Sequence, residues 1–342
     1  MGLKARLVAT ISAALASLLL ASPAAADTVI RFNSWLPATH PITAKTLKPW
    51  ADEVAKVTQG RVKVEFTSGS LGKPDAQLDM VRDGIVDAAL SVHGMTPTRF
   101  PLVMVGELPF LSRDSEPLSV ALWQVTQKYF AAKDEHQGVH LVTVFVSQPG
   151  LVWTSKRSLK HIKDWEGAKL AGGSAITLDI SKLVGAVPLR APGPQMSEML
   201  KRGTVDGIYI DASSFIDFSL AGTVKHVLDF PKGVYAATFY VVVNNNKWNA
   251  IAPADRAAID RISGEALART AGRNWDIEAQ KARDSLKAAG VEVTLADGPH
   301  LKSLEDKLRP LEEQWVQKAR TSGVDGKAAL TDLKTLVSNY RK

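Results

Sequence analysis

The feature that most constrains the fold is a repeated alternation of short apolar segments, loops and amphipathic helical segments. In order along the chain, these are a predicted strand at 28–32, helical spacing over 42–58, a strand pattern at 61–66, a short helix at 74–82 and a strand at 88–92. The period of the apolar residues switches between that of a strand and that of a helix. Such β-loop-α alternation predicts a largely parallel sheet with helices on both faces.

The same order returns in the second half of the chain. Strand patterns occur at 139–146, 151–154, 168–171, 187–190 and 207–211. We therefore predict an α/β fold of two doubly wound α/β lobes with a hinge and a ligand cleft between them. Lobe 1 is expected mainly within residues 27–150 and lobe 2 mainly within 151–250. The later strand pattern at 238–244, "TFYVVVN", is a candidate crossing between the lobes.

Residues 251–342 differ because long helical segments replace the alternation. Apolar residues recur at helical spacing from Ala252-Pro253 to Gly290. A helix of about 35 residues reaches roughly 50 Å. We therefore expect this helix to brace both lobes, with the C-terminal helices also spanning them.

The first residues predict export. Lys4 and Arg6 precede an apolar run at 7–20, and small residues end at Ala26. These are the three parts of a secretory signal peptide, expected at 1–26 and cleaved near Ala26. A membrane anchor is the alternative, but the run is short for a span. We predict a periplasmic protein without direct membrane insertion.

The composition of the chain excludes several classes of function. The chain has no Cys and a net charge of +7, and removing two basic residues with the signal peptide leaves +5. The absence of Cys excludes thiol catalysis and Cys-based metal sites. The basic residues are interspersed with acidic ones, so no stripe for nucleic acid is present and nucleic acid is not an expected partner.

Catalytic machinery is not evident in the sequence. Neither a phosphate-binding loop nor a G-x-S-x-G elbow occurs, and Ser174 follows two glycines without a closing one. His136 and His140 are four apart, but Gly138 between them argues against a helical metal site. We therefore predict no enzyme activity, no cofactor and no metal. An exported enzyme that uses the same cleft is the alternative.

Loops after the predicted strands contain small, polar and aromatic side chains suited to a small solute. They include Ser34, Trp35, His93, Trp153, Gly172, Gly173, Ser174, Asp211 and Ser214. In open α/β sheets the carboxyl ends of the strands converge on a crevice, which predicts a binding cleft there. Each residue also has a structural interpretation: the tryptophans pack in the core, Ser and Asp cap helices, and glycines allow tight turns.

The sequence resembles the periplasmic solute receptors of tripartite ATP-independent (TRAP) transporters. The matching segments, in the family's order, are "IRFNSWLPATHP" at 30–41, "WADEVAKVTQGRVKVEFTSGSLGKPDAQLDMVRDGIVDAAL" at 50–90, "ELPFL" at 107–111, "DWEGAKL" at 164–170, "GAVPL" at 185–189, "EMLKRGTVDG" at 198–207 and "FYVVVNNNKWNAIAPADRAAI" at 239–259. The resemblance implies two lobes that close on a small organic solute and deliver it to TRAP membrane permease subunits. It implies neither catalysis nor ATP hydrolysis.

One position departs from the family pattern. The family typically has Gly-x-Lys-x-Arg where this chain has Gly167 to Ala171, and that arginine binds the carboxylate of an organic acid. A second arginine of the family corresponds to Leu151. Guanidinium binds carboxylate through two parallel charge-assisted bonds, so their loss removes several kcal/mol of binding. An acid ligand therefore does not carry over from the family.

We expect a cationic or neutral solute, such as a small amine or quaternary ammonium. Tyr209 and Asp211 lie on the same face of the strand "GIYID", and aromatic faces beside a carboxylate suit a cation. The alternative is an organic acid whose positive anchor is relocated to Arg190, Lys169 or Arg99, or whose carboxylate binds the helix amides that follow Ser174. Delivery to a sensor instead of a permease also stays open.

Overall fold

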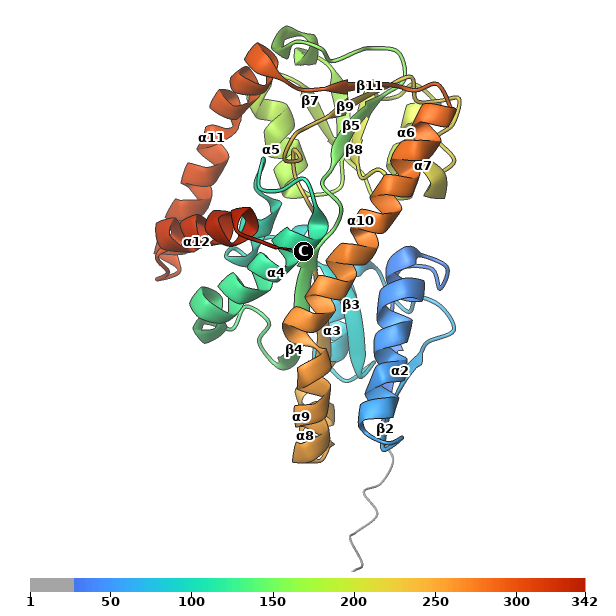
Figure 1. Ribbon diagram of the computed structural model, residues 1–342, viewed down its shortest axis with the longest axis vertical. Helices are drawn as coiled ribbons and strands as arrows, with labels where there is room; N and C mark the ends of the chain where they lie inside the picture. The colour runs from blue at the N-terminus through green and yellow to red at the C-terminus, as the bar shows by residue number, and fades with distance from the viewer. Residues whose placement is uncertain (1–27, 342) are drawn as a thin grey trace, which may run out of the picture.

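Two separate sheets form the framework, one in each lobe (Figure 1). The computed structural model describes residues 28–341, apart from the side chain of Pro194, so the predicted signal peptide lies outside the described range. Both sheets are mixed and are covered by helices, which confirms the α/β class with two lobes.

Sheet 1, in lobe 1, has the strand order β2-β1-β3-β10-β4. Its strands are β1 (Thr28–Asn33), β2 (Val62–Phe66), β3 (Ala88–Val92), β4 (Val139–Val146) and β10 (Thr238–Asn244). Strands β2, β1 and β3 are parallel, whereas β10 runs antiparallel to both β3 and β4. The helices of this lobe are α2 (Lys48–Val57), α3 (Gln77–Arg82), α4 (Ser115–Val125), α8 (Asn245–Ala250) and α9 (Pro253–Ile262).

Sheet 2, in lobe 2, has the strand order β11-β9-β5-β8-β6-β7. Its strands are β5 (Leu151–Thr154), β6 (Lys169–Gly172), β7 (Val187–Arg190), β8 (Gly207–Ile210), β9 (His226–Asp229) and β11 (Glu292–Leu295). Helices α5 (Ala175–Leu183), α6 (Gly193–Lys201) and α7 (Ser214–Asp217) belong to this lobe. Strand β11 corrects the expectation of helices alone after residue 251, because it adds a parallel edge strand beside β9.

Two non-helical segments, 147–150 and 230–237, carry the chain between the lobes. They are hydrogen-bonded to each other: the Ser147 amide donates to the Ala237 carbonyl at 2.8 Å, and the Gly150 amide donates to the Tyr235 carbonyl at 2.7 Å. A Cβ atom on Gly150 would lie 1.9 Å from the Tyr235 ring, so this close approach requires glycine. The paired crossing segments form a narrow hinge.

Helix α10 (Gly264–Ala288) is the third connection and runs along both lobes (Figure 1). Its Ala271 and Trp275 pack in the lobe 1 core, and its Leu286 packs in the lobe 2 core. The helix is shorter than predicted, since Gly264 adopts φ +53° and separates it from α9. A length of 25 residues corresponds to about 38 Å.

The last two helices, α11 (Gly298–Thr321) and α12 (Gly326–Ser338), flank the lobes on the side away from α10 (Figure 1). The Trp315 indole of α11 donates to the carbonyl oxygens of Pro101 and Leu102 in lobe 1. The C-terminal Tyr340 hydroxyl donates to Glu116 at 2.6 Å, and Arg273 of α10 binds the same carboxylate through two nitrogens. These bonds fix the C-terminal segment and α10 to lobe 1.

Candidate functional site

A cavity of about 550 Å³ lies between the two lobes, within the size range of small-molecule sites. Its lining comes from the carboxyl ends of β1, β3, β6 and β8, from the crossing segment before β10, and from α10. We call this cavity the cleft. Its lining includes Trp35, His40, Gly94, Glu107, Gly173, Ser174, Tyr209, Asp211, Ser214, Asp217, Phe218, Tyr235, Phe239 and Trp275.

Aromatic side chains from both lobes and from α10 make most of the cleft apolar. The indole nitrogens of Trp35 and Trp275 are buried and have no hydrogen-bond partner. Native buried donors are almost always paired, so these two N–H groups are available to an acceptor from ordered water or from a ligand. The His40 ring packs edge-on against Trp275 with centroids 5.8 Å apart.

His40 contributes a polar but uncharged side chain to the cleft. Burial lowers its pKa, and the nearby Asp211 charge opposes the shift only partly. Its Nδ1 accepts a hydrogen bond from the Ile42 amide at 3.2 Å, which leaves the proton on Nε2 in the neutral ring. His40 therefore supplies an N–H donor and no positive charge at neutral pH.

Acidic side chains stand on both sides of the cleft. Asp211 follows β8 and accepts bonds from the Ser213 hydroxyl at 2.6 Å and from the Ser214 amide and hydroxyl at 3.2 and 3.1 Å. It thus organises the start of α7 while it also lines the cleft. Asp217 is the last residue of α7. Its partial burial is the main cause that raises its pKa to about 6, and the charges of Asp211 and Glu278 add to the rise.

Glu107 is the most deeply buried acid of the cleft, with 1% of its surface exposed. Its Oε1 accepts bonds from the Thr238 amide at 3.0 Å and from the Thr238 hydroxyl at 2.9 Å. Its Oε2 has no partner. Burial raises the pKa of Glu107 to about 7, and the two Thr238 bonds only partly offset that rise.

Six of the residues predicted for the site line the cleft: Trp35, Gly173, Ser174, Tyr209, Asp211 and Ser214. Ser174 is the residue before α5, and its hydroxyl is buried without a partner. The Tyr209 ring lines the cleft, but its hydroxyl pairs with Ser181 at 3.0 Å, and burial raises its pKa.

The other four predicted residues do not line the cleft. Trp153 is fully buried in the lobe 2 core, where it stacks on Phe215 and its indole donates to the Ile210 carbonyl at 2.9 Å. Ser34 is buried in a turn, with its hydroxyl beside the Leu36 carbonyl at 3.3 Å. Core packing and turn chemistry therefore account for both residues.

The remaining two residues also have structural roles. His93 is buried with its Nε2 3.0 Å from that of His136, and burial lowers the pKa of both rings. A Cβ atom on Gly172 would lie 2.1 Å from the Thr177 hydroxyl, so this glycine allows the turn into α5. Among residues 28–341, no group of three or more His, Cys, Asp or Glu could hold a metal ion.

No Lys or Arg lines the cleft among the residues that the structure describes. Of the three candidate anchors, Arg190 and Lys169 are exposed outside it, and Arg99 pairs with Asp79 at 2.8 Å. Ala171 itself is fully buried in the lobe 2 core, in a row across the strands with Ile208 and Trp153. The relocated arginine or lysine is therefore absent from this part of the structure.

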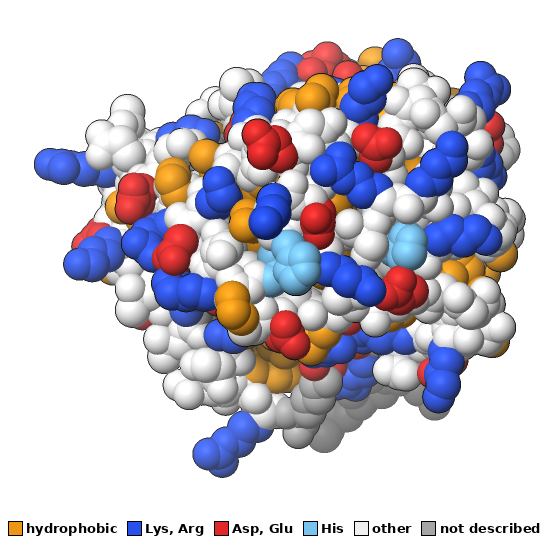
Figure 2. Space-filling view, turned by 90° about the horizontal axis from the view of Figure 1, so that it is seen from above, with side chains coloured by type: hydrophobic (Ala, Val, Ile, Leu, Met, Phe, Trp, Pro, Cys, Tyr) orange, Lys and Arg blue, Asp and Glu red, His pale blue; other side chains and the backbone are white. Residues whose placement is uncertain are grey.

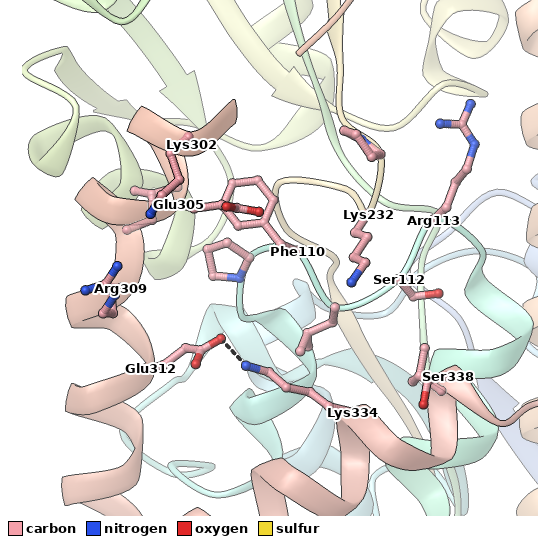
Figure 3. A pocket seen from close by; sticks show the side chains of 15 residues that line it. Phe110, Ser112, Arg113, Lys232, Lys302, Glu305, Arg309, Glu312, Lys334 and Ser338 are labelled. Atoms are coloured by element: carbon pink, nitrogen blue, oxygen red, sulfur yellow. Dashed lines mark hydrogen bonds and ion pairs between the residues drawn. The ribbon is translucent and has the colours of Figure 1, made fainter. Parts of the chain in front are cut away.

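A second hollow, of about 530 Å³, lies between α11, α12 and the loops at 109–113 and 231–232 (Figure 3). Its lining is basic, but Lys334 is paired with Glu312, and both Lys302 and Arg309 pair with Asp306. These side chains are also largely exposed, and exposed pairs contribute little binding energy. The face of the molecule seen from above likewise mixes basic and acidic side chains (Figure 2). The cleft remains the candidate site.

Sequence reasoning missed several polar or aromatic residues of the cleft, among them Glu107, Asp217, Tyr235 and Trp275. Glu107 opens the segment "ELPFL", and a single acid beside four apolar residues was the available signal. Asp217, Tyr235 and Trp275 carry no such signal, because their positions depend on how the crossing segments and α10 pack.

Two hinged α/β lobes around an aromatic cleft with unpaired polar atoms define a solute receptor of the periplasmic-binding-protein class. The model of the bacterial extracellular solute-binding protein family 7 (DctP) matches residues 32–318, and the chain belongs to this family. Its relatives include the periplasmic solute receptors of TRAP transporters, so the chain is a TRAP-type solute receptor and not an enzyme. No helix within residues 28–341 is long and apolar enough to cross a membrane.

Individual relatives extend over nearly the whole chain. The "outer membrane transporter protein TsaT" of Comamonas testosteroni is 32% identical over 93% of this chain and 94% of its own. A TRAP solute-binding protein of Bordetella bronchiseptica, solved with (R)- and (S)-mandelate, is 33% identical with a TM-score of 0.87, covering 91% of this chain and 98% of that one. A marine metagenome receptor specific for aromatic acids, solved with 3-hydroxybenzoate, is 30% identical with a TM-score of 0.84, covering 93% and 100%.

Proposed function

We propose that this receptor captures a small solute with an aromatic or apolar body that is cationic or neutral, and delivers it to TRAP permease subunits. The observation that carries the proposal is the charge of the cleft: Glu107, Asp211 and Asp217 line it, and no Lys or Arg does so among the described residues. A carboxylate placed there loses its hydration and meets acids without a cation to offset them.

The size and the aromatic lining of the cleft support an aromatic or apolar body for the solute. Solved relatives bind mandelate and 3-hydroxybenzoate, each of which has one aromatic ring. Trp35 and Trp275 offer faces for such a ring, and an aromatic face next to a carboxylate also attracts an ammonium group. We therefore expect a ring of similar size with a different charge.

Matched probes test the charge. Phenylacetate, phenethylamine and 2-phenylethanol share a ring and a two-carbon unit but present an acid, an amine and an alcohol. The mature protein is refolded to remove bound ligand and melted with each probe. A probe at a hundred times its dissociation constant stabilises the fold by about 2.7 kcal/mol, which a melting curve resolves.

We expect the amine or the alcohol to raise the melting temperature and the acid to leave it unchanged. Asp211→Asn should abolish the rise in melting temperature that phenethylamine causes. Asp179→Asn, which alters an exposed acid of lobe 2 outside the cleft, should leave that rise unchanged. A shift with phenylacetate alone would overturn the proposal and would indicate that the amides at the start of α5 hold a carboxylate.

A further inference from the structure

Glu107 has one satisfied and one unsatisfied carboxylate oxygen. Thr238 donates two hydrogen bonds to Oε1, and Oε2 is buried against the cleft without any partner. An unpaired buried carboxylate oxygen is costly for a folded chain, and each such atom in a native structure requires an explanation.

Burial alone does not explain the free oxygen. Glu135 of lobe 1 is also largely buried, yet its two oxygens accept bonds from the amides of Leu102 and Val103 at 2.7 and 3.0 Å. The fold thus pairs both oxygens of one buried glutamate and leaves one oxygen of the other without a protein partner. The difference between them is that Glu107 lines the cleft.

Gly94 keeps Glu107 uncovered. A Cβ atom at position 94 would lie 3.2 and 3.3 Å from the two Glu107 oxygens and 3.1 Å from the Ser174 Cβ of lobe 2. Any side chain there would screen the carboxylate from the cleft. Because residue 94 has no side chain, none of its atoms covers the Glu107 carboxylate.

Glu107 and Asp211 act on the same cleft from opposite lobes. Both residues line the cleft together with Tyr235, and their charges raise the pKa of Tyr235, although the burial of that ring is the largest cause of the shift. Asp211 already accepts bonds from Ser213 and Ser214, whereas Oε2 of Glu107 accepts none. The lobe 1 side of the cleft therefore has an acceptor that no described protein group satisfies.

We infer that Glu107 determines specificity by accepting a hydrogen bond from a second donor group of the solute. This inference rests on the proposed function. The solute then carries two separate donors on its aromatic or apolar body: a cationic or hydroxyl group toward Asp211, and an O–H or N–H group toward Oε2 of Glu107.

The test uses probe pairs that differ only in the second donor. 4-Hydroxybenzylamine and tyramine carry a phenolic O–H, and their methyl ethers keep the amine and the ring but lose that donor. We expect the phenols to bind at least about tenfold more tightly than the ethers, as measured by calorimetry, because the ethers leave Oε2 unpaired.

Glu107→Gln keeps the Thr238 bonds through its amide oxygen and presents an N–H donor to the cleft. The preference for phenols should then vanish or reverse toward the ethers. Gly94→Ala should also reduce the preference, because it covers the carboxylate without changing it. Glu135→Gln is the matched control and should keep the wild-type preference.

The outcomes separate this inference from the proposed function. If the amines bind but phenols and ethers bind equally, or if the preference survives both Glu107→Gln and Gly94→Ala, Glu107 is not the second anchor and the charge assignment stands. If none of the amines binds and phenylacetate does, the proposed charge fails and the inference fails with it.

Discussion

Replacement of Glu107 by Gln should stabilise the ligand-free receptor at alkaline pH. Burial raises the pKa of Glu107 to about 7 from an ordinary value of 4.5. A carboxyl group whose pKa is higher in the folded state destabilises the fold as it ionises. Wild-type stability should therefore begin to fall as pH rises above about 4.5, and the loss should be complete once pH has passed 7.

The magnitude follows from the shift in pKa. Each pKa unit corresponds to about 1.4 kcal/mol, so ionisation of Glu107 destabilises the fold by on the order of 3 kcal/mol. The amide of the Glu107→Gln variant does not ionise and still accepts both Thr238 bonds. The variant should match the wild type near pH 4.5 and exceed it by about this amount at pH 8. Urea unfolding of the ligand-free protein at pH 4.5, 6 and 8 measures the difference.

Glu135→Gln provides the comparison. The pKa of Glu135 is also raised to about 7 by burial, but its two oxygens accept two backbone N–H groups. An amide has a single acceptor oxygen, so this variant loses one bond at every pH and gains less at pH 8. A gain for Glu107→Gln that is equal at pH 4.5 and pH 8 would refute the reasoning, since the gain must follow ionisation.

Three further predictions concern packing, the hinge and the ion pair between Arg273 and Glu116. Trp153→Ala should destabilise the fold by about 3–5 kcal/mol in urea unfolding, because its indole fills the lobe 2 core. Trp35→Ala should weaken solute binding and have a smaller effect on stability, because Trp35 lines the cleft. Gly150→Ala should displace the Tyr235 ring of the hinge and reduce both stability and solute affinity; unchanged calorimetric affinity would contradict this. Arg273→Ala should reduce stability by about 1 kcal/mol at pH 7, because it removes two bonds to the Glu116 carboxylate from an arginine that is itself 60% exposed, and the difference from wild type should shrink on acidification as that carboxyl protonates.

Periodicity in the sequence was sufficient to predict two α/β lobes, but it could not assign the faces of the short strands. Trp153 and Tyr209 both belong to predicted strands, yet Trp153 lies opposite Ile208 in the ladder and so faces the other side of the sheet from Tyr209. Cross-strand register decides that outcome, and no local pattern encodes it. The same register buries Ala171, with Trp153, in the core of lobe 2.

The cleft was predictable only as far as it is built from strand ends. Trp35, Ser174 and Asp211 follow strands and line the cavity, and the topology of α/β folds leads to the expectation of a crevice at such strand ends. Trp275 lies within a helix whose apolar spacing indicates burial and nothing more. The burial of Glu107 could not be predicted locally, because the Thr238 amide and hydroxyl that bind its carboxylate are distant in the sequence.

The position of β10 determines when lobe 1 can be completed during biosynthesis. This strand pairs with β3 on one side and β4 on the other, although most of lobe 2 lies between β4 and β10 in the chain. Sheet 1 therefore stays open until the ribosome has made Asn244, and sheet 2 in turn waits for β11. Such non-local pairing slows folding. Neither sheet can therefore reach its native strand order until late in synthesis of the chain.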